Sequence, residues 1–252
     1  MNLRKKIIIV VMTLSGLMIS ITSNSQVLIS ILLGDKLNSG AIEFGLSGGY
    51  TNSQIFSSKD TKGLNSGHLG FYFDIRLKNK LFLYTGVQVK SNLGATGLSM
   101  KTYAIDDQDL DTLLKDATLK RKLNYFNVPI MIKYRFKSNI YVNAGVQLGL
   151  RYKSYDYYYE KIEEKNDLIY KYSIKDQLTR IDAGVTAGLG YKFKYGWEMN
   201  IGARYYYGLT NIYKSNGYGT NGALYIFGEI PIGAGKQKEK MRKEIEEEMK
   251  EK

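Results

Sequence analysis

The chain has 252 residues and is basic, with 36 Lys and Arg side chains against 24 Asp and Glu, which gives a formal net charge of +12. This length permits one domain of about 200 residues after an N-terminal targeting segment. The absence of cysteine excludes disulfide bonds and thiol chemistry.

Residues 1–25 have the pattern of an export signal. Basic residues at 4–6 precede an apolar run at 7–21, and small residues after this run fit cleavage before Gln26. The alternative is a retained transmembrane helix, but the run is shorter than the ~20 residues that such a helix needs. We therefore predict a signal peptide at 1–25 and a periplasmic segment at 26–40.

Eight later segments alternate apolar residues with small or polar ones, as strands with two different faces do. In the clearest segment, Trp197, Ile201 and Tyr205 fall on one side, whereas Asn200 and Arg204 fall on the other. The predicted strands are 41–51, 67–77, 81–91, 123–136, 140–153, 178–193, 197–209 and 222–233.

The apolar set of these strands contains no ionisable side chain, from Ile42, Phe44 and Leu46 in the first strand to Ile230 and Ile232 in the last. A Lys or Arg facing the middle of a bilayer would cost ~2–4 kcal/mol, so a lipid-facing surface requires this exclusion. We therefore predict an all-β fold at 41–233: an eight-stranded antiparallel up-and-down transmembrane β-barrel. The alternative is a soluble barrel whose outer face packs against a partner.

Aromatic residues gather near the two ends of the predicted strands, as interfacial girdles do in membrane barrels. One level holds Tyr134, Phe136, Tyr191, Phe193 and Trp197, and the other holds Tyr50, Phe126, Tyr152, Tyr205 and Tyr207.

The connections alternate between short and long. Three-residue turns at 78–80, 137–139 and 194–196 contrast with longer connections such as 92–122 and 154–177. In bacterial outer-membrane barrels the short turns are periplasmic and the long loops are extracellular. An even strand count then predicts that both ends of the mature protein lie in the periplasm.

Two local features modify this picture. Pro129 removes a ladder donor, so we expect a bulge or an unmade hydrogen bond beside it. Residues 234–252 are almost wholly Lys and Glu, with Met241, Ile245 and Met249 at four-residue spacing. This spacing predicts a charged periplasmic helix whose narrow apolar stripe is solvated or binds a periplasmic partner.

The inward positions carry charges of both signs. Because an eight-stranded barrel is just wide enough to be filled by its own side chains, opposite charges are expected to pair and block flow. The alternative is a gated path that favours anions. The acidic candidates are Glu43, Asp74, Asp182, Glu198 and Glu229, and the basic ones are Arg76, Lys90, Lys133, Arg135, Arg151, Arg180, Lys192 and Arg204.

The sequence predicts no catalytic, cofactor-binding or metal-binding residue. His68 is the only histidine, and it falls on an inward position with Ser66 nearby. No orienting acid or nucleophile can be identified from the spacing, so we interpret His68 as an ordinary polar residue and the protein as a non-enzyme.

The predicted loop at 154–177 is rich in tyrosine among Lys and Glu, which is typical of surfaces that recognise proteins or glycans. The alternative is that these rings extend the outer girdle. The candidate recognition residues are Tyr155, Tyr157, Tyr158, Tyr159, Tyr170 and Tyr172.

Several segments resemble the PorT-like outer-membrane β-barrel family, often labelled the porin family. They include Tyr125 to Tyr134 with its Val-Pro pair, Tyr141 to Gly145, Asp182 to Gly184 and Ala203 to Ile212. The resemblance covers residues 41–233 and implies an eight-stranded outer-membrane barrel with little agreed biochemical activity. It does not imply conductance.

These observations predict a non-enzymatic outer-membrane protein that binds at the surface or supports the envelope. Its expected partners are outer-membrane lipid and lipopolysaccharide, an extracellular protein or glycan, and a periplasmic protein at the tail, but no nucleic acid. A small anion-favouring channel is the alternative. A component of a secretion apparatus or an outer-membrane enzyme ranks below both.

Overall fold

The computed structural model describes residues 41–56, 62–98, 118–163, 166–193, 198–215 and 217–232, with the side chains at 160–168 left out. The predicted signal peptide, the segment 26–40 and the charged tail 234–252 lie outside the described residues. So does Trp197.

The described chain is an antiparallel sheet with one short 3-10 helix, η2 (Lys175–Gln177). The strands are β1 (Ile42–Phe56), β2 (Lys62–Lys78), β3 (Leu81–Leu98), β4 (Thr118–Arg135), β5 (Ile140–Glu163), β6 (Asn166–Ser173), β7 (Ile181–Lys192), β8 (Asn200–Gly208) and β9 (Thr220–Pro231).

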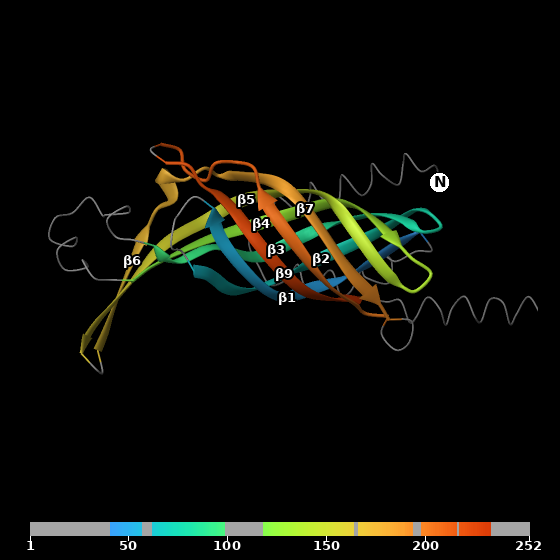
Figure 1. Ribbon diagram of the computed structural model, residues 1–252, viewed down its shortest axis with the longest axis horizontal. Coiled ribbons are helices and arrows are strands. Elements are labelled where there is room, and N and C mark those ends of the chain that lie inside the picture. Colours follow the sequence, from blue (N-terminus) through green and yellow to red (C-terminus); the bar gives the residue numbers. More distant parts are fainter. Residues whose placement is uncertain are drawn as a thin grey trace, which may run out of the picture.

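The sheet closes on itself. The strands pair in the order β4-β3-β2-β1-β9-β8-β7-β5, and an additional β4–β5 pairing completes the ring. Eight of the described strands form this ring, and each corresponds to a predicted strand. The remaining strand, β6, pairs only with the outer part of β5. Figure 1 shows the strands inclined to the long axis and the β5–β6 hairpin, in yellow, extending beyond the ring.

We call the end with the short turns, such as Lys78 to Leu81 and Arg135 to Ile140, the turn end. The end with the β5–β6 hairpin is the loop end. Because side chains alternate along a strand, each strand presents one set of residues to the lumen and another to the outside. On β7, Leu189 faces outward and is 62% exposed, whereas Lys192, three residues further along the strand, faces inward and is buried. In the turn-end half of the barrel the polar residues are therefore inside and the apolar residues outside, the reverse of a soluble protein.

The outer aromatic residues form pairs at both levels predicted from the sequence. At the turn end, the ring centroids of Tyr134 and Phe136 are 5.0 Å apart. At the loop-end level, Phe126 stacks on Tyr152 with a centroid distance of 4.5 Å. Phe44 differs from the expectation of a lipid-exposed ring. It is only 2% exposed, because the rings of Phe71 and Phe73 pack against it.

Several strands are longer than the sequence pattern predicted. The expected loop at 92–122 begins as the continuation of β3 to Leu98 and ends within β4, which starts at Thr118. The expected loop at 154–177 is largely the β5–β6 hairpin. Polar residues on the outward face, such as Lys120 and Lys122, hid these extensions, since the outward apolar positions stop where the strands leave the apolar zone.

Two irregularities matter for the faces of β3. The β3–β4 ladder lacks pairs between Thr85–Ile130 and Gln88–Asn127, and Pro129 lies in this gap. The β2–β3 ladder shifts by one residue between Leu69–Lys90 and Gly70–Gln88. An extra residue in one strand reverses which side chains face inward beyond it. Lys90, predicted to face the lumen, is therefore exposed, and Ser91 is buried instead.

Candidate functional site

The turn-end half of the lumen is crossed by charged side chains. Lys133 on β4 reaches over β3 to Asp74 on β2, with 2.6 Å between Nζ and Oδ2 and side chains 0% and 1% exposed. The ammonium also lies 4.1 Å from the ring centre of Tyr141 and 5.5 Å from that of Tyr84. The carboxylate neutralises this buried lysine, and the faces of the two aromatic rings stabilise its ammonium group.

A second group links opposite sides of the ring. Tyr84 on β3 donates a hydrogen bond of 2.7 Å to Glu229 on β9 and accepts one of 3.1 Å from Arg204 on β8. Asn200 donates to the other oxygen of Glu229 at 3.1 Å, and the Arg204 guanidinium lies 4.8 Å from the ring centre of Phe227. These side chains tie β3 to β8 and β9 through the lumen.

A third pair joins Glu43 on β1 to Lys192 on β7, and Tyr72 donates a hydrogen bond of 3.0 Å to the same carboxylate.

The ring of Tyr141 has space to cross β7 because position 190 is glycine. A Cβ on Gly190 would lie 2.4 Å from the Tyr141 ring and 2.5 Å from the Ile201 carbonyl oxygen.

The loop-end half of the lumen contains a large cluster of buried apolar side chains among buried polar ones. Its buried cluster is formed by Ile55, Leu93, Ala95, Leu98, Leu119, Leu123, Tyr125, Tyr158, Ile174, Leu178, Tyr206, Ile212, Ala223, Tyr225 and Phe227. Within it, Asp182 accepts hydrogen bonds from Thr210 at 2.7 Å and from Asn221 at 2.9 Å, and Asn221 also donates to Tyr125. This part of the barrel has the packed interior of a soluble protein.

Two short segments lie across the mouth at the loop end. Leu178 and Tyr213 form an isolated bridge, and the Thr179 amide donates to the Ile212 carbonyl at 2.8 Å. The Arg151 guanidinium fixes the first segment by donating to the carbonyls of Lys175, Leu178 and Thr179. Predicted to pair with a lumen carboxylate, Arg151 instead holds the backbone that covers the lumen.

An ion pair that the sequence did not predict lies beside this cover. Arg121 on β4 and Asp156 on β5 are directly opposite in the ladder and form two hydrogen bonds of 2.8 and 2.6 Å. Arg121 also donates to the Tyr213 hydroxyl at 3.1 Å. The sequence analysis placed both residues in loops, at 92–122 and 154–177. If β4 and β5 had been predicted to continue through these residues, the opposite charges at facing inward positions would have indicated the pair.

Several predicted lumen residues lie at its edges. Arg76 is exposed near the turn end, 5.9 Å from the Phe82 ring, and the partly buried Arg135 lies 4.3 Å from the same ring. Arg180 is exposed at the loop end, just before β7. Glu198 precedes β8 with a φ of 50°, so it lies in the connection and not on the strand. β7 and β8 begin three residues later than predicted, which leaves Arg180 and Glu198 outside the strands, whereas Arg76 and Arg135 lie within the last turn-end residues of β2 and β4.

Within the described residues, the buried charged side chains are nearly balanced. Five are basic (Arg121, Lys133, Arg151, Lys192 and Arg204), and four are acidic (Asp74, Asp156, Asp182 and Glu229), with Glu43 partly buried beside them. The predicted excess of basic residues in the lumen is therefore not found there. Arg76, Arg135 and Arg180 lie at the ends of the lumen, and Lys90 lies on the outer surface.

The tyrosines of the predicted recognition loop divide between the two faces of the β5–β6 hairpin. Tyr158 is buried and its ring centroid is 6.2 Å from that of Tyr170, while Tyr170 and Tyr172 pack against the apolar cluster. Tyr155, Tyr157 and Tyr159 are the alternate residues and face outward. The strand alternation thus leaves three of the six candidates on the outer surface.

His68 faces the lumen, as its strand position predicts. Its Nδ1 lies 2.8 Å from the Thr51 hydroxyl, and its ring meets the Tyr225 ring edge to face at 5.2 Å. The hydrogen-bond partner of the imidazole among the described residues is thus the Thr51 hydroxyl.

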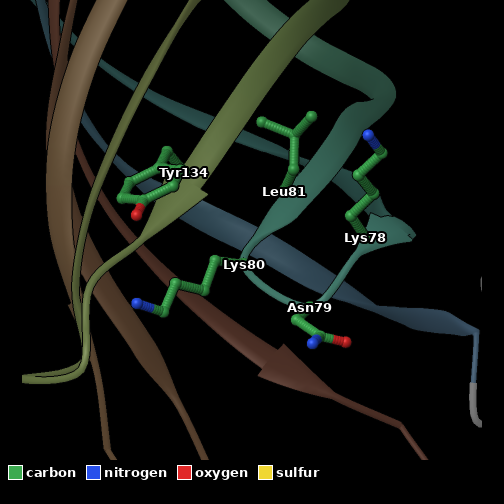
Figure 2. A pocket seen from close by; sticks show the side chains of 5 residues that line it. All are labelled: Lys78, Asn79, Lys80, Leu81 and Tyr134. Carbon is green, nitrogen blue, oxygen red and sulfur yellow. The ribbon is translucent and has the colours of Figure 1, made fainter.

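A shallow hollow of about 610 Å³ lies on the outer wall at the turn end, away from the lumen. Figure 2 shows Leu81 and Tyr134 on adjacent strands, with Lys78 beside Leu81 and with Asn79 and Lys80 below them at the turn. In the described part of the chain, no group of three or more His, Cys, Asp or Glu residues could hold a metal ion. None of the described helices is long and apolar enough to cross a membrane.

A closed antiparallel ring with an apolar outside, paired aromatic residues at both ends and a polar, filled inside defines the class of transmembrane β-barrels. The chain belongs to the outer membrane protein beta-barrel domain family, whose model matches residues 26–214. Membership places the protein in the bacterial outer membrane. No curated protein matches the sequence.

Solved structures with a similar fold are distant in sequence. The attachment invasion locus protein Ail of Yersinia pestis is 12% identical over 76% of this chain and 99% of its own, with a TM-score of 0.40. Neisserial surface protein A is 15% identical over 76% and 99% of the two chains, also with a TM-score of 0.40. The N-terminal barrel domain of Pseudomonas aeruginosa OprF is 11% identical over 74% and 96%, with a TM-score of 0.27.

Proposed function

We propose that this protein is a non-conducting, non-enzymatic outer-membrane barrel that binds at the cell surface or supports the envelope. The observation that carries the proposal is the filled lumen. Charged pairs such as Lys133–Asp74 occupy its turn-end half, and the apolar cluster around Tyr125 and Tyr225 occupies the other. A hydrated ion would have to displace both, since an eight-stranded barrel leaves room for little beyond its own side chains.

The loop end faces the outside of the cell in this proposal, and the turn end faces the periplasm, as the lengths of the connections favour. Both ends of the mature chain, including the charged tail 234–252, then lie in the periplasm, where the tail is available to a protein partner. The β5–β6 hairpin projects from the cell surface with Tyr155, Tyr157 and Tyr159 outward, a surface suited to a protein or glycan ligand. A PorT-like role beside a secretion apparatus is compatible with this arrangement.

Conductance separates this proposal from the channel alternative. Wild-type protein reconstituted in planar bilayers should show no steady openings, because its lumen is closed by paired charges and packed rings. The matched variant Tyr84→Ala, Tyr141→Ala removes two rings that cross the lumen and leaves every charge in place. It should also show no steady openings, because the apolar cluster around Tyr125 and Tyr225 still fills the loop-end half. Gel migration before and after heating checks that the variant is folded. Steady, anion-selective openings of the wild type would favour the channel.

The orientation can be tested with single cysteines, because the chain has none of its own. Ile169→Cys lies on the exposed face of β6, and Ser138→Cys lies in an exposed turn at the opposite end. A membrane-impermeant maleimide should label Ile169→Cys on intact cells and Ser138→Cys only after the outer membrane is permeabilised. An epitope after Lys252 should behave like Ser138→Cys. Labelling in the reverse order would show that the barrel is inverted.

A further inference from the structure

Five lysines lie on the outer wall of the barrel where it passes the loop-end aromatic level. They come from four neighbouring strands, β3 to β6, and the function proposed above does not use them. We call this surface the lysine patch; its members are Lys90, Lys120, Lys122, Lys153 and Lys171.

The strand register brings four of these lysines together. Lys122 lies directly opposite Tyr155, and Lys120 lies opposite Tyr157, which in turn lies opposite Lys171 on β6. One step nearer the turn end, Lys153 is opposite Asn124. Neighbouring strands are about 4.8 Å apart, so the ammonium groups of these long side chains can converge on one ligand.

Aromatic rings hold part of the patch in place. Lys171 Nζ lies 3.9 Å from the ring centre of Tyr155 and 5.8 Å from that of Tyr157. Such cation–π contacts fix an ammonium without neutralising its charge. Burial, together with the charges of Lys120, Lys90 and Lys171, lowers the pKa of Lys122 below its usual value. The lysines therefore repel one another, and an anion between them would relieve this repulsion.

Among the described side chains, which exclude 160–168, the chain supplies no such anion. None of the ion pairs formed there includes a lysine of the patch. The acid nearest in sequence, Asp156, points inward and is already paired with Arg121. Like charges gathered on one surface without acidic partners fit an external anionic ligand.

The height of the patch identifies the source of the anion. The stacked rings of Phe126 and Tyr152 mark the edge of the apolar zone, and Lys153 follows Tyr152 directly. Lys122 is four residues beyond Phe126, which places it ~9 Å above the rings for a strand rise of ~3.3 Å per residue and a tilt of ~45°. Lipid headgroups occupy roughly 5–8 Å on each side of the hydrocarbon layer. The patch thus spans the level of the lipid phosphates.

We infer that the lysine patch binds the phosphate groups of lipopolysaccharide in the outer leaflet. Lys90 and Lys153 contact phosphates at the hydrocarbon edge, and Lys120, Lys122 and Lys171 contact those further out. The patch faces sideways into the leaflet, which favours a lipid over a soluble glycan. This inference rests on the orientation proposed above but not on closure of the lumen.

The test uses the purified full-length protein in detergent micelles, with lipid A bisphosphate as the probe and calorimetry as the measurement. The triple variant Lys122→Gln, Lys153→Gln, Lys171→Gln should bind about 100-fold more weakly, since each surface lysine contributes about fivefold to affinity for anionic lipid. The matched control Lys78→Gln, Lys80→Gln, Lys137→Gln removes the same charge from exposed turn-end positions. Because these lysines lie outside the patch, this control should bind with an affinity within about twofold of that of the wild type. Dephosphorylated lipid A should bind the wild type as weakly as it binds the patch variant.

Three results would overturn the inference. Equal losses in both triple variants would show that only net charge matters, and equal binding of dephosphorylated lipid A would show that the acyl chains are recognised. Binding of soluble heparin that requires the patch, with lipid A binding unchanged in the patch variant, would assign the patch to a sulfated glycan. Because the micelle assay does not depend on conductance or on orientation in cells, its failure is distinguishable from failure of the proposed function.

Discussion

Asp74→Asn should lower the free energy of unfolding by about 3–5 kcal/mol, the usual effect of breaking a buried ion pair. The substitution leaves the Lys133 ammonium, which is fully buried, without the carboxylate that lies 2.6 Å away. Urea unfolding of protein refolded into lipid vesicles, followed by gel migration before and after heating, measures the change.

The double variant Asp74→Leu, Lys133→Met is the control, because it removes both charges and keeps similar side-chain volumes. Replacing a buried pair by apolar residues is often neutral or stabilising, so its unfolding midpoint should be at or above that of the wild type. A double variant as unstable as Asp74→Asn would show that the packing around Tyr84 and Tyr141, and not the uncompensated charge, determines stability here.

Val146→Arg should strongly reduce assembly into the membrane, because it places a charge in the middle of the apolar wall. Val146 is 46% exposed on β5 and pairs with Ile130 on one side and Val185 on the other, both exposed apolar residues. An arginine facing the bilayer midplane costs ~2–4 kcal/mol. The folded fraction in outer-membrane preparations, measured by heat-dependent gel migration, should fall accordingly.

Ile169→Arg provides the matched control. Ile169 is also apolar and 56% exposed, but it lies on β6, beyond the aromatic level at Phe126 and Tyr152. This substitution should leave assembly unchanged, since the arginine would face water. Equal losses from the two substitutions would contradict the position assigned to the apolar zone.

The eight ring strands could be predicted because their signal is local. In a membrane barrel the lipid requires an apolar residue at every second position, and this period is visible in a single segment such as 140–153 without knowledge of its neighbours. The same exclusion of charge that marks the outer face also identifies the inward charges, so Lys133, Asp74, Arg204 and Glu229 were recognised as a group.

The strand extensions at the loop end could not be predicted, because no lipid imposes alternation there. Among its described side chains, the β5–β6 hairpin carries Tyr and Lys on its outward face and Tyr and Asp on its inward face, a composition that is also typical of a loop. Its inward tyrosines, such as Tyr158, are recognisable only from the apolar cluster that they complete.

The sequence by itself therefore determined which residues meet lipid and which face inward, since that choice depends on the period of a single strand. The tertiary structure decided which partners meet. Lys133 binds Asp74 two strands away, Arg151 holds the backbone over the mouth, and a one-residue shift in β3 moves Lys90 from the lumen to the lysine patch. Such contacts depend on the register between strands and on ring closure, which join residues far apart in the chain and leave no mark in any one segment.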